Sequence, residues 1–97
     1  MRGRARMRER EFMPKVKIFW KETCPNCPAA KELGKRLAAE GAVVEFLNVK
    51  DADGLTEAVL HGVMATPSVA VVADDGTEKT VWRGATPKLD EVKEALK

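Results

Sequence analysis

The chain has 97 residues, which is enough for one domain with one hydrophobic core and too few for two. Its formal net charge is +2, and residues 1–11 hold five arginines and two glutamates, so residues 12–97 carry a net charge of −1. This nearly neutral part has no basic stripe, so we expect no nucleic-acid partner. No apolar run approaches the roughly 20 residues that cross a bilayer, so we expect no membrane partner.

Residues 1–12 alternate arginine with small or polar residues and lack the hydrophobic segment of a secretory signal. We expect a disordered basic extension here, followed by a folded domain over residues 13–97. A basic arm that touches nucleic acid or anionic lipid is a weaker interpretation. Translation from Met7 or Met13 is another alternative, and Met13 leads directly into the first predicted strand.

Residues 16–20 form an apolar run that predicts a strand buried on both faces. Both cysteines follow it in one C-x-x-C motif, Cys24-Pro25-Asn26-Cys27, at the start of a helical pattern. This spacing lets the two sulfurs close a small disulfide ring, and the unpaired N–H groups of a helix start favour a thiolate at Cys24. A single such pair beside a βαβ pattern indicates a redox pair in a reducing compartment, so we expect a cytoplasmic protein.

The next helix is predicted over residues 25–40, with Pro25 at its first position and Cys27 one turn in, on the less accessible side. Pro28 would then remove a donor in the first full turn and loosen the helix start. Gly34 is expected to allow close packing on the sheet. Residues 43–49 form a second strand, which the right-handed crossover rule makes parallel to the first.

A short helix follows, capped by an aspartate and ending at His61 and Gly62. Its pattern predicts that Leu55, Ala58 and Val59 face the core.

Residues 68–73 and 80–82 are predicted strands, and the Asp75-Gly76 pair between them is a strong hairpin signal. The last helix is expected to start with Thr86 as its cap and Pro87 at its first position. The residues of its predicted buried stripe are Leu89, Val92 and Leu96. The resulting order is β-α-β-α-β-β-α, with two parallel strands followed by an antiparallel hairpin.

The C-x-x-C corner, the element order and the loop Met64-Ala65-Thr66-Pro67 together resemble the thioredoxin fold, over about residues 14–96. The length is similar to that of the minimal, glutaredoxin-sized members. The resemblance implies an α/β fold with a four-stranded mixed sheet flanked by helices. It also implies a thiol–disulfide oxidoreductase that reduces protein disulfides.

In this family the proline that matches Pro67 is cis and lies beside the two sulfurs, and the main chain before it pairs with the substrate like an added strand. The resemblance therefore implies that Cys24 and Cys27 are catalytic. The substrate-binding residues that it implies are Pro25, Asn26, Ala65, Thr66 and Pro67. The implied partners are disulfide-containing protein substrates and a thioredoxin-reductase-like or other dithiol reductant. We expect a monomer without a metal or other cofactor.

The sequence departs from the thioredoxin pattern before the first cysteine. Ile18 stands where thioredoxins carry a buried aspartate, and Thr23 replaces the usual tryptophan. The proton that Cys27 needs or releases would then be exchanged with water or with a nearby group such as Lys21 or Glu22.

Other functions stay open at this point. A disulfide isomerase or oxidant would use the same cysteines. A glutathione-linked glutaredoxin is disfavoured, because the stretch from Arg83 to Pro87 is closer to the Val-Gly-Ala of thioredoxins than to the Gly-Gly of glutaredoxins. A zinc or iron–sulfur site would have to be shared between two chains, since only His61 offers a further ligand. A non-catalytic binding module that uses the edge at Thr66 would need no paired cysteines.

Overall fold

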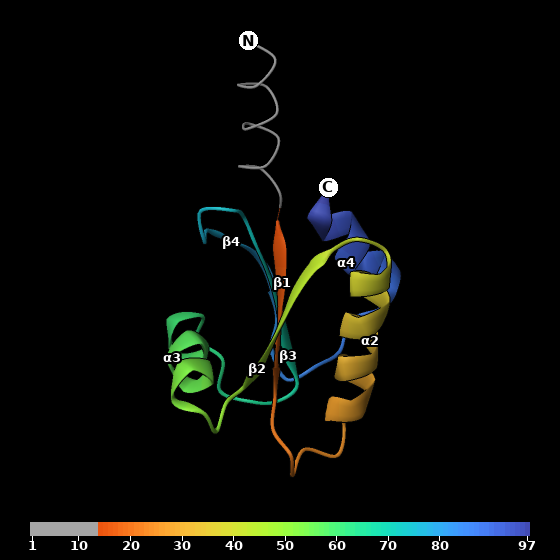
Figure 1. Ribbon diagram of the computed structural model, residues 1–97. Coiled ribbons are helices and arrows are strands. Elements are labelled where there is room, and N and C mark those ends of the chain that lie inside the picture. Colours follow the sequence, from red (N-terminus) through yellow and green to blue (C-terminus); the bar gives the residue numbers. More distant parts are fainter. Residues whose placement is uncertain (1–13) are drawn as a thin grey trace.

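The computed structural model describes residues 14–97, in which a four-stranded sheet carries helices on both faces (Figure 1). In chain order the elements are β1 (Lys15–Trp20), α2 (Cys27–Ala39), β2 (Val43–Asn48), α3 (Ala52–Leu60), β3 (Ser68–Val72), β4 (Glu78–Trp82) and α4 (Leu89–Leu96). The predicted order and fold class are therefore confirmed. The predicted extension over residues 1–12 lies outside the described residues, as does Met13.

The strands lie in the order β2-β1-β3-β4. β1 pairs in parallel with β2 and antiparallel with β3, and β4 continues the sheet antiparallel to β3. All five residues of β3 and the four inner residues of β1 are buried. The inner residues of β1 are thus buried on both faces, as its apolar run predicts.

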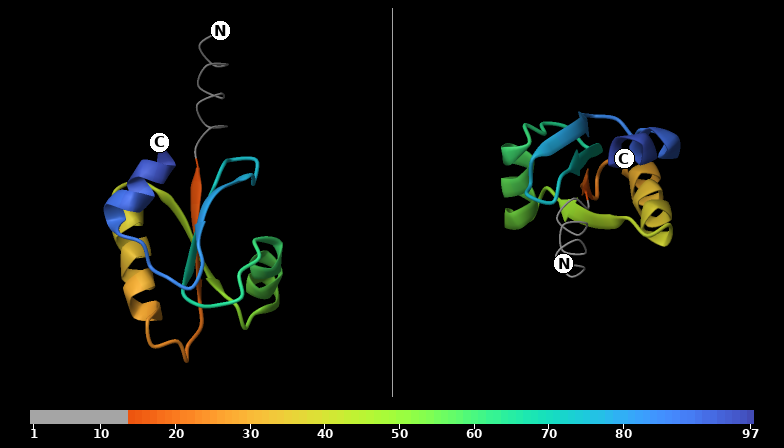
Figure 2. Two further views of the ribbon diagram at one scale, coloured as in Figure 1. Left: turned by 180° about the vertical axis from the view of Figure 1, so that it is seen from behind. Right: turned by 90° about the horizontal axis from the view of Figure 1, so that it is seen from above.

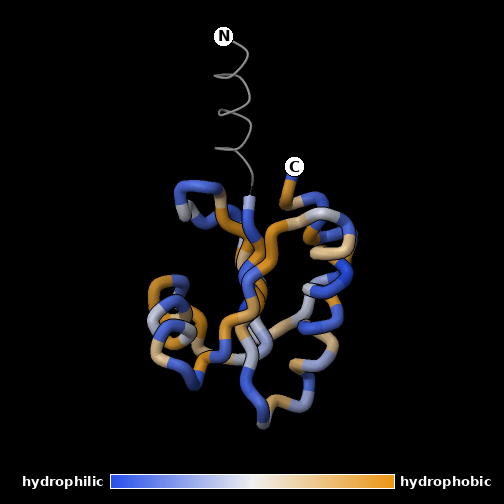
Figure 3. Tube along the Cα trace, viewed as in Figure 1, coloured by the Kyte–Doolittle hydropathy of each residue, from blue (hydrophilic) through white to orange (hydrophobic). Residues whose placement is uncertain are grey.

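The helices form two unequal layers. Figure 2 shows α2 and α4 together on one face of the sheet and α3 alone on the other. The core under α2 and α4 includes Ile18, Leu37 and Val92, and the core under α3 includes Phe19 and Ala58. The hydrophobic residues accordingly run along the central strands in Figure 3.

α2 begins two residues later than predicted. Its first residue is Cys27, with Asn26 at the N-cap position, so Pro25 lies in the preceding turn. Pro28 occupies the first helical turn, where main-chain N–H groups have no partner within the helix. Pro28 therefore costs α2 no hydrogen bond, which removes the reason for expecting a loosened helix start.

α3 faces the sheet with smaller residues than predicted. Ala58 is buried as expected, but Leu55 and Val59 are 54% and 71% exposed. Gly54 and Ala58 are the buried residues of α3, and Gly54 lies against the main-chain carbonyl of Asn48. Because this close approach fixes the inner face, the next residue in each case, about 100° around the helix, points outward.

α4 begins at Leu89 with Lys88 at the N-cap position, not at Pro87 with Thr86 as its cap. The Glu91 carboxylate accepts a hydrogen bond from the Lys88 main-chain N–H at 2.9 Å, and this contact sets the helix start. The predicted buried stripe is confirmed, with Val92 fully buried and Leu89 and Leu96 packed against the core.

The predicted hairpin between β3 and β4 is also present. Gly76 adopts a φ of +91°, and the Asp75 carboxylate accepts a hydrogen bond from the main-chain N–H of Thr77 at 2.9 Å. Within residues 14–97, none of the helices is long and apolar enough to span a membrane.

Candidate active site

Strand register brings the two predicted site segments together. β1 ends at Trp20, and β3 begins at Ser68, which pairs antiparallel with Phe19. The chain that leaves β1 and the chain that enters β3 therefore meet at one end of the sheet, the lower end in Figure 1. This end carries the C-x-x-C corner and residues 65–67.

The two sulfurs form a disulfide between Cys24 and Cys27, whose Cα atoms lie 5.3 Å apart. The main-chain N–H of Cys27 donates a hydrogen bond to the carbonyl of Cys24 at 3.3 Å, which closes the turn between them. Cys24 is 6% exposed and Cys27 is 2% exposed, so Cys27 is the less accessible, as expected. Pro25 and Asn26 lie between them and are exposed.

The loop before β3 also matches the expectation. The peptide bond between Thr66 and Pro67 is cis. Pro67 is buried, Thr66 is half-buried and Ala65 is exposed. A small groove of about 150 Å³ runs beside this loop, with Lys21, Ala65 and Thr66 among its lining residues.

Two side chains form hydrogen bonds with the main chain of the segment between α3 and β3. The sequence analysis identified neither of them. The Arg83 guanidinium donates to the carbonyls of His61 and Gly62 at 2.7 and 3.1 Å. The Ser68 hydroxyl donates to the carbonyl of Ala65 at 2.6 Å. The loop is thus attached to the sheet at both of its ends.

The groups expected to influence the thiol differ in what they contact. Ile18 is fully buried within the apolar core, at the place where thioredoxins carry an aspartate. The Lys31 ammonium lies 3.6 Å from the centre of the Trp20 ring, a cation–π contact that connects α2 to the end of β1. Glu22 is exposed next to the corner and Lys21 lines the groove, so both stay hypotheses for proton exchange.

A partly buried ionic cluster lies beside α3. Lys17 is only 9% exposed, and its ammonium donates to the Glu57 carboxylate and lies 3.3 Å from Nε2 of His61. Nδ1 of His61 lies 2.9 Å from a Glu78 oxygen. The hydrogen bond from Lys17 lowers the pKa of Glu57 below its ordinary value. These contacts engage His61, the ligand considered for a metal site, and residues 14–97 contain no group of three or more metal-ligating side chains.

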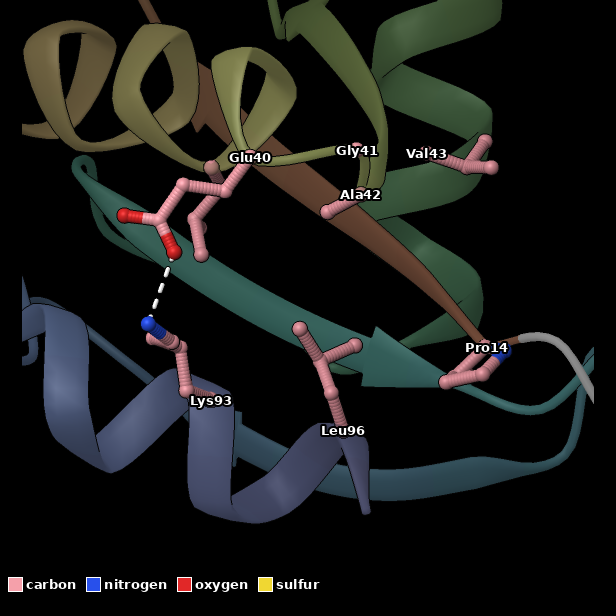
Figure 4. Close-up of a pocket in the computed structure, with 8 residues that line it drawn as sticks. Pro14, Glu40, Gly41, Ala42, Val43, Lys93 and Leu96 are labelled. Atoms are coloured by element: carbon pink, nitrogen blue, oxygen red, sulfur yellow. Dashed lines mark ion pairs between the residues drawn. The ribbon is translucent and has the colours of Figure 1, made fainter.

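A cavity of about 290 Å³ lies between the ends of α2 and α4 and the start of β2 (Figure 4). Glu40 and Lys93 form an ion pair of 2.7 Å beside it. Its lining includes none of the predicted site residues. This cavity is therefore separate from the redox corner, where Pro25 and Asn26 are the exposed residues between the two cysteines.

Comparison with known proteins agrees with this geometry. Residues 14–97 match the thioredoxin domain family. The chain belongs to the thioredoxin family. A thioredoxin from Methanocaldococcus jannaschii is 33% identical over 63 residues, which cover 62% of this chain and 72% of that protein. A probable thioredoxin from Archaeoglobus fulgidus is 33% identical over 60 residues, which cover 61% of this chain and 66% of that protein, just under two thirds of its length.

Solved structures share the thioredoxin fold. A mutant thioredoxin from Halobacterium salinarum superposes with a TM-score of 0.73 at 21% identity, over 88% of this chain and 73% of that one. A thioredoxin-like protein from Clostridium perfringens gives a TM-score of 0.74 at 15% identity, over 89% of this chain and 70% of that one. At these identities the likeness concerns the fold alone.

Family membership and the Cys24–Cys27 pair together support thiol–disulfide oxidoreductase chemistry. They also indicate disulfide-containing substrates and a reducing partner in general terms.

Proposed function

We propose that this thioredoxin-family protein reduces disulfides in other proteins by dithiol exchange through Cys24 and Cys27. The observation that carries the proposal is the position of the disulfide, at a surface corner beside the loop that contains Thr66 and Pro67. A substrate can approach this corner from solvent without entering a cavity.

The reaction proceeds in two exchanges. In the reduced protein the Cys24 thiolate attacks one sulfur of the substrate disulfide, forms a mixed disulfide and expels the other substrate sulfur as a thiolate. Cys27, as a thiolate, then attacks the Cys24 sulfur and releases the second substrate thiol. The substrate gains two electrons and two protons, and the protein is left with the Cys24–Cys27 disulfide. An external dithiol reductant returns both electrons and both protons.

The surroundings of the two cysteines support the roles that we propose for them. Cys24 is the more exposed of the two cysteine residues and lies in the turn before α2, so we assign it the attack on the substrate. Cys27 lies in the first turn of α2 and is nearly inaccessible, which suits a resolving thiol that reacts only within the protein. Thiolate formation in both is favoured by the partial positive charge of the α2 N-terminus.

The substrate chain is proposed to pair with the main chain of Thr66, next to the disulfide. The remaining contacts would come from residues that surround the same corner, namely Pro25, Asn26, Ala65 and Pro67. Backbone pairing of this kind is tolerant of sequence, so it suits a reductase with many protein substrates. We propose that the protein acts as a monomer, in the cytoplasm.

Serine variants of the two cysteines test the assignment. Cys27→Ser should accumulate covalent mixed disulfides with protein substrates, because the resolving thiol is missing, and mass spectrometry after alkylation detects them. Cys24→Ser should accumulate none under the same conditions and serves as the matched control. Trapping by Cys24→Ser in place of Cys27→Ser would reverse the roles, and trapping by neither would contradict the mechanism.

The direction of electron flow is tested by the reduction potential of the pair. A value near the thioredoxin reference of about −270 mV supports a reductase. A value closer to about −180 or −120 mV would instead favour the isomerase or oxidant function.

A further inference from the structure

One hydroxyl connects the loop before β3 with the loop after β4. Ser68 is the first residue of β3, and it is fully buried. Its Oγ donates a hydrogen bond to the carbonyl of Ala65 at 2.6 Å and accepts one from the main-chain N–H of Gly84 at 3.0 Å. The single donor and one of the two acceptor sites of this hydroxyl are therefore used.

The two groups that Ser68 joins belong to different segments. Ala65 lies in the loop that enters β3, directly before Thr66, and Gly84 lies in the connection between β4 and α4. Gly84 adopts a φ of +70°, and a Cβ placed on it would lie 3.5 Å from the Ala65 Cβ. The two loops are thus in contact, and Ser68 supplies a hydrogen-bonded bridge between them.

The Ser68 hydroxyl contacts loop residues and not side chains of the core. Ser68 itself is buried, but its two partners, Ala65 and Gly84, are exposed loop residues and not members of the core clusters. Arg83 holds the other end of the same loop, at His61 and Gly62. Without the hydroxyl, the part of the loop next to Thr66 would lose its own attachment to the sheet while that at Gly62 remained.

We propose that Ser68 is a positioning residue, whose hydroxyl holds the main chain at Ala65 and Thr66 in the orientation that pairs with an extended protein substrate. This inference rests on the proposed function. It predicts that Ser68 affects the binding of protein disulfides and leaves the chemistry at the Cys24 sulfur unchanged. A small disulfide, which has no main chain to pair with Thr66, should therefore be insensitive to Ser68.

The test compares Ser68→Ala with the wild-type protein in the reduction of insulin and of a small aromatic disulfide. A lost hydrogen bond of ordinary strength corresponds to a change of about 3- to 10-fold, so the KM for insulin should rise by about that factor. The kcat for insulin and the rate with the small disulfide should stay within about twofold of wild type. The Gly84 amide should also exchange its hydrogen faster in the variant.

Two controls separate positioning from stability. Val72→Ala removes buried volume from the same strand and should lower stability without raising the KM for insulin. The threonine and valine side chains have nearly the same shape, but only threonine keeps a hydroxyl. Ser68→Thr should therefore have a lower KM for insulin than Ser68→Val. This pair also keeps the test valid if Ser68→Ala does not fold.

Each contrary outcome has a separate meaning. An active wild type combined with an unchanged KM in Ser68→Ala overturns the positioning role alone. If Val72→Ala raises the KM for insulin as much as Ser68→Ala does, the effect comes from lower stability and the positioning role is overturned. The same conclusion follows if Ser68→Thr and Ser68→Val raise the KM equally. A wild-type protein that does not reduce insulin contradicts the proposed function itself, and this inference with it.

Discussion

Gly34 and Gly54 are both helical glycines that lie against the sheet, but they meet different neighbours. A Cβ on Gly34 would lie 2.6 Å from the end of the Phe46 ring, and Phe46 is itself 42% exposed. A Cβ on Gly54 would overlap the main-chain carbonyl of Asn48. The ring can turn toward solvent, whereas the carbonyl is part of β2 and is held in place by the backbone.

We predict that Gly54→Ala lowers the free energy of unfolding by about 1–3 kcal/mol, because α3 must move away from the sheet. This loss is what remains after the gain of about 1 kcal/mol in helix propensity that alanine brings. Gly34→Ala is the matched control and should change stability by less, since its neighbours are the side chains of Phe46 and Ile18 and not the main chain. Urea denaturation of both variants measures the difference, and equal losses would contradict the distinction.

At the scale of elements, Lys17 connects the central strand β1 to α3. Its ammonium contacts Glu57 of α3 and His61, which directly follows α3, and His61 in turn reaches Glu78 of β4. Lys17 donates a hydrogen bond to Glu57, and this contact is the main reason that the pKa of Glu57 lies below its ordinary value of 4.5.

This shift makes the stability of the protein depend on pH. Because the pKa of Glu57 is lower in the folded state, its contribution is fully present above pH 4.5 and is lost as the pH falls through the folded value. We predict that Glu57→Gln lowers the free energy of unfolding at neutral pH by about 1–3 kcal/mol, since Lys17 loses its charged partner.

The loss of stability on acidification should also be smaller in Glu57→Gln than in wild type. Urea unfolding at about pH 7, 5 and 3 measures both effects. Glu32→Gln, an exposed change on α2, is the control and should alter neither. A wild-type and a Glu57→Gln protein that lose equal stability between these pH values would refute the assignment.

The order of elements could be predicted from sequence because its signals are local. The apolar runs mark β1 and β3, Asp75-Gly76 marks the hairpin, and Gly62 marks the end of α3. Helix starts were harder to predict. Pro25 and Pro28 both suit the first turn of a helix, and in the structure Pro28 occupies the first turn of α2.

Contacts between distant residues could not be predicted in this way. The cysteine pair and the cis proline follow from motifs, but Lys17 meets a glutamate 40 residues away, and Ser68 meets a glycine 16 residues away. Likewise, the apolar pattern of α3 does not reveal that Gly54 approaches a carbonyl and turns Leu55 outward. Only tertiary structure selects these partners.

At the scale of the whole molecule, residues 14–97 contain all four strands of the sheet and both core clusters. We predict that a chain that starts at Met13 folds with the same stability as the full chain, within about 0.5 kcal/mol. Thermal and urea unfolding of the two proteins test this. A markedly less stable short chain would show that residues 1–12 belong to the folded domain.

The two residues between the cysteines can be replaced without disturbing the fold. Pro25 and Asn26 are exposed, they precede α2, and the Asn26 side chain makes no capping hydrogen bond. Mutation can therefore change both residues with little penalty to folding. Because both residues lie between the two sulfurs, their replacement alters the surroundings of the disulfide and leaves the scaffold as it is.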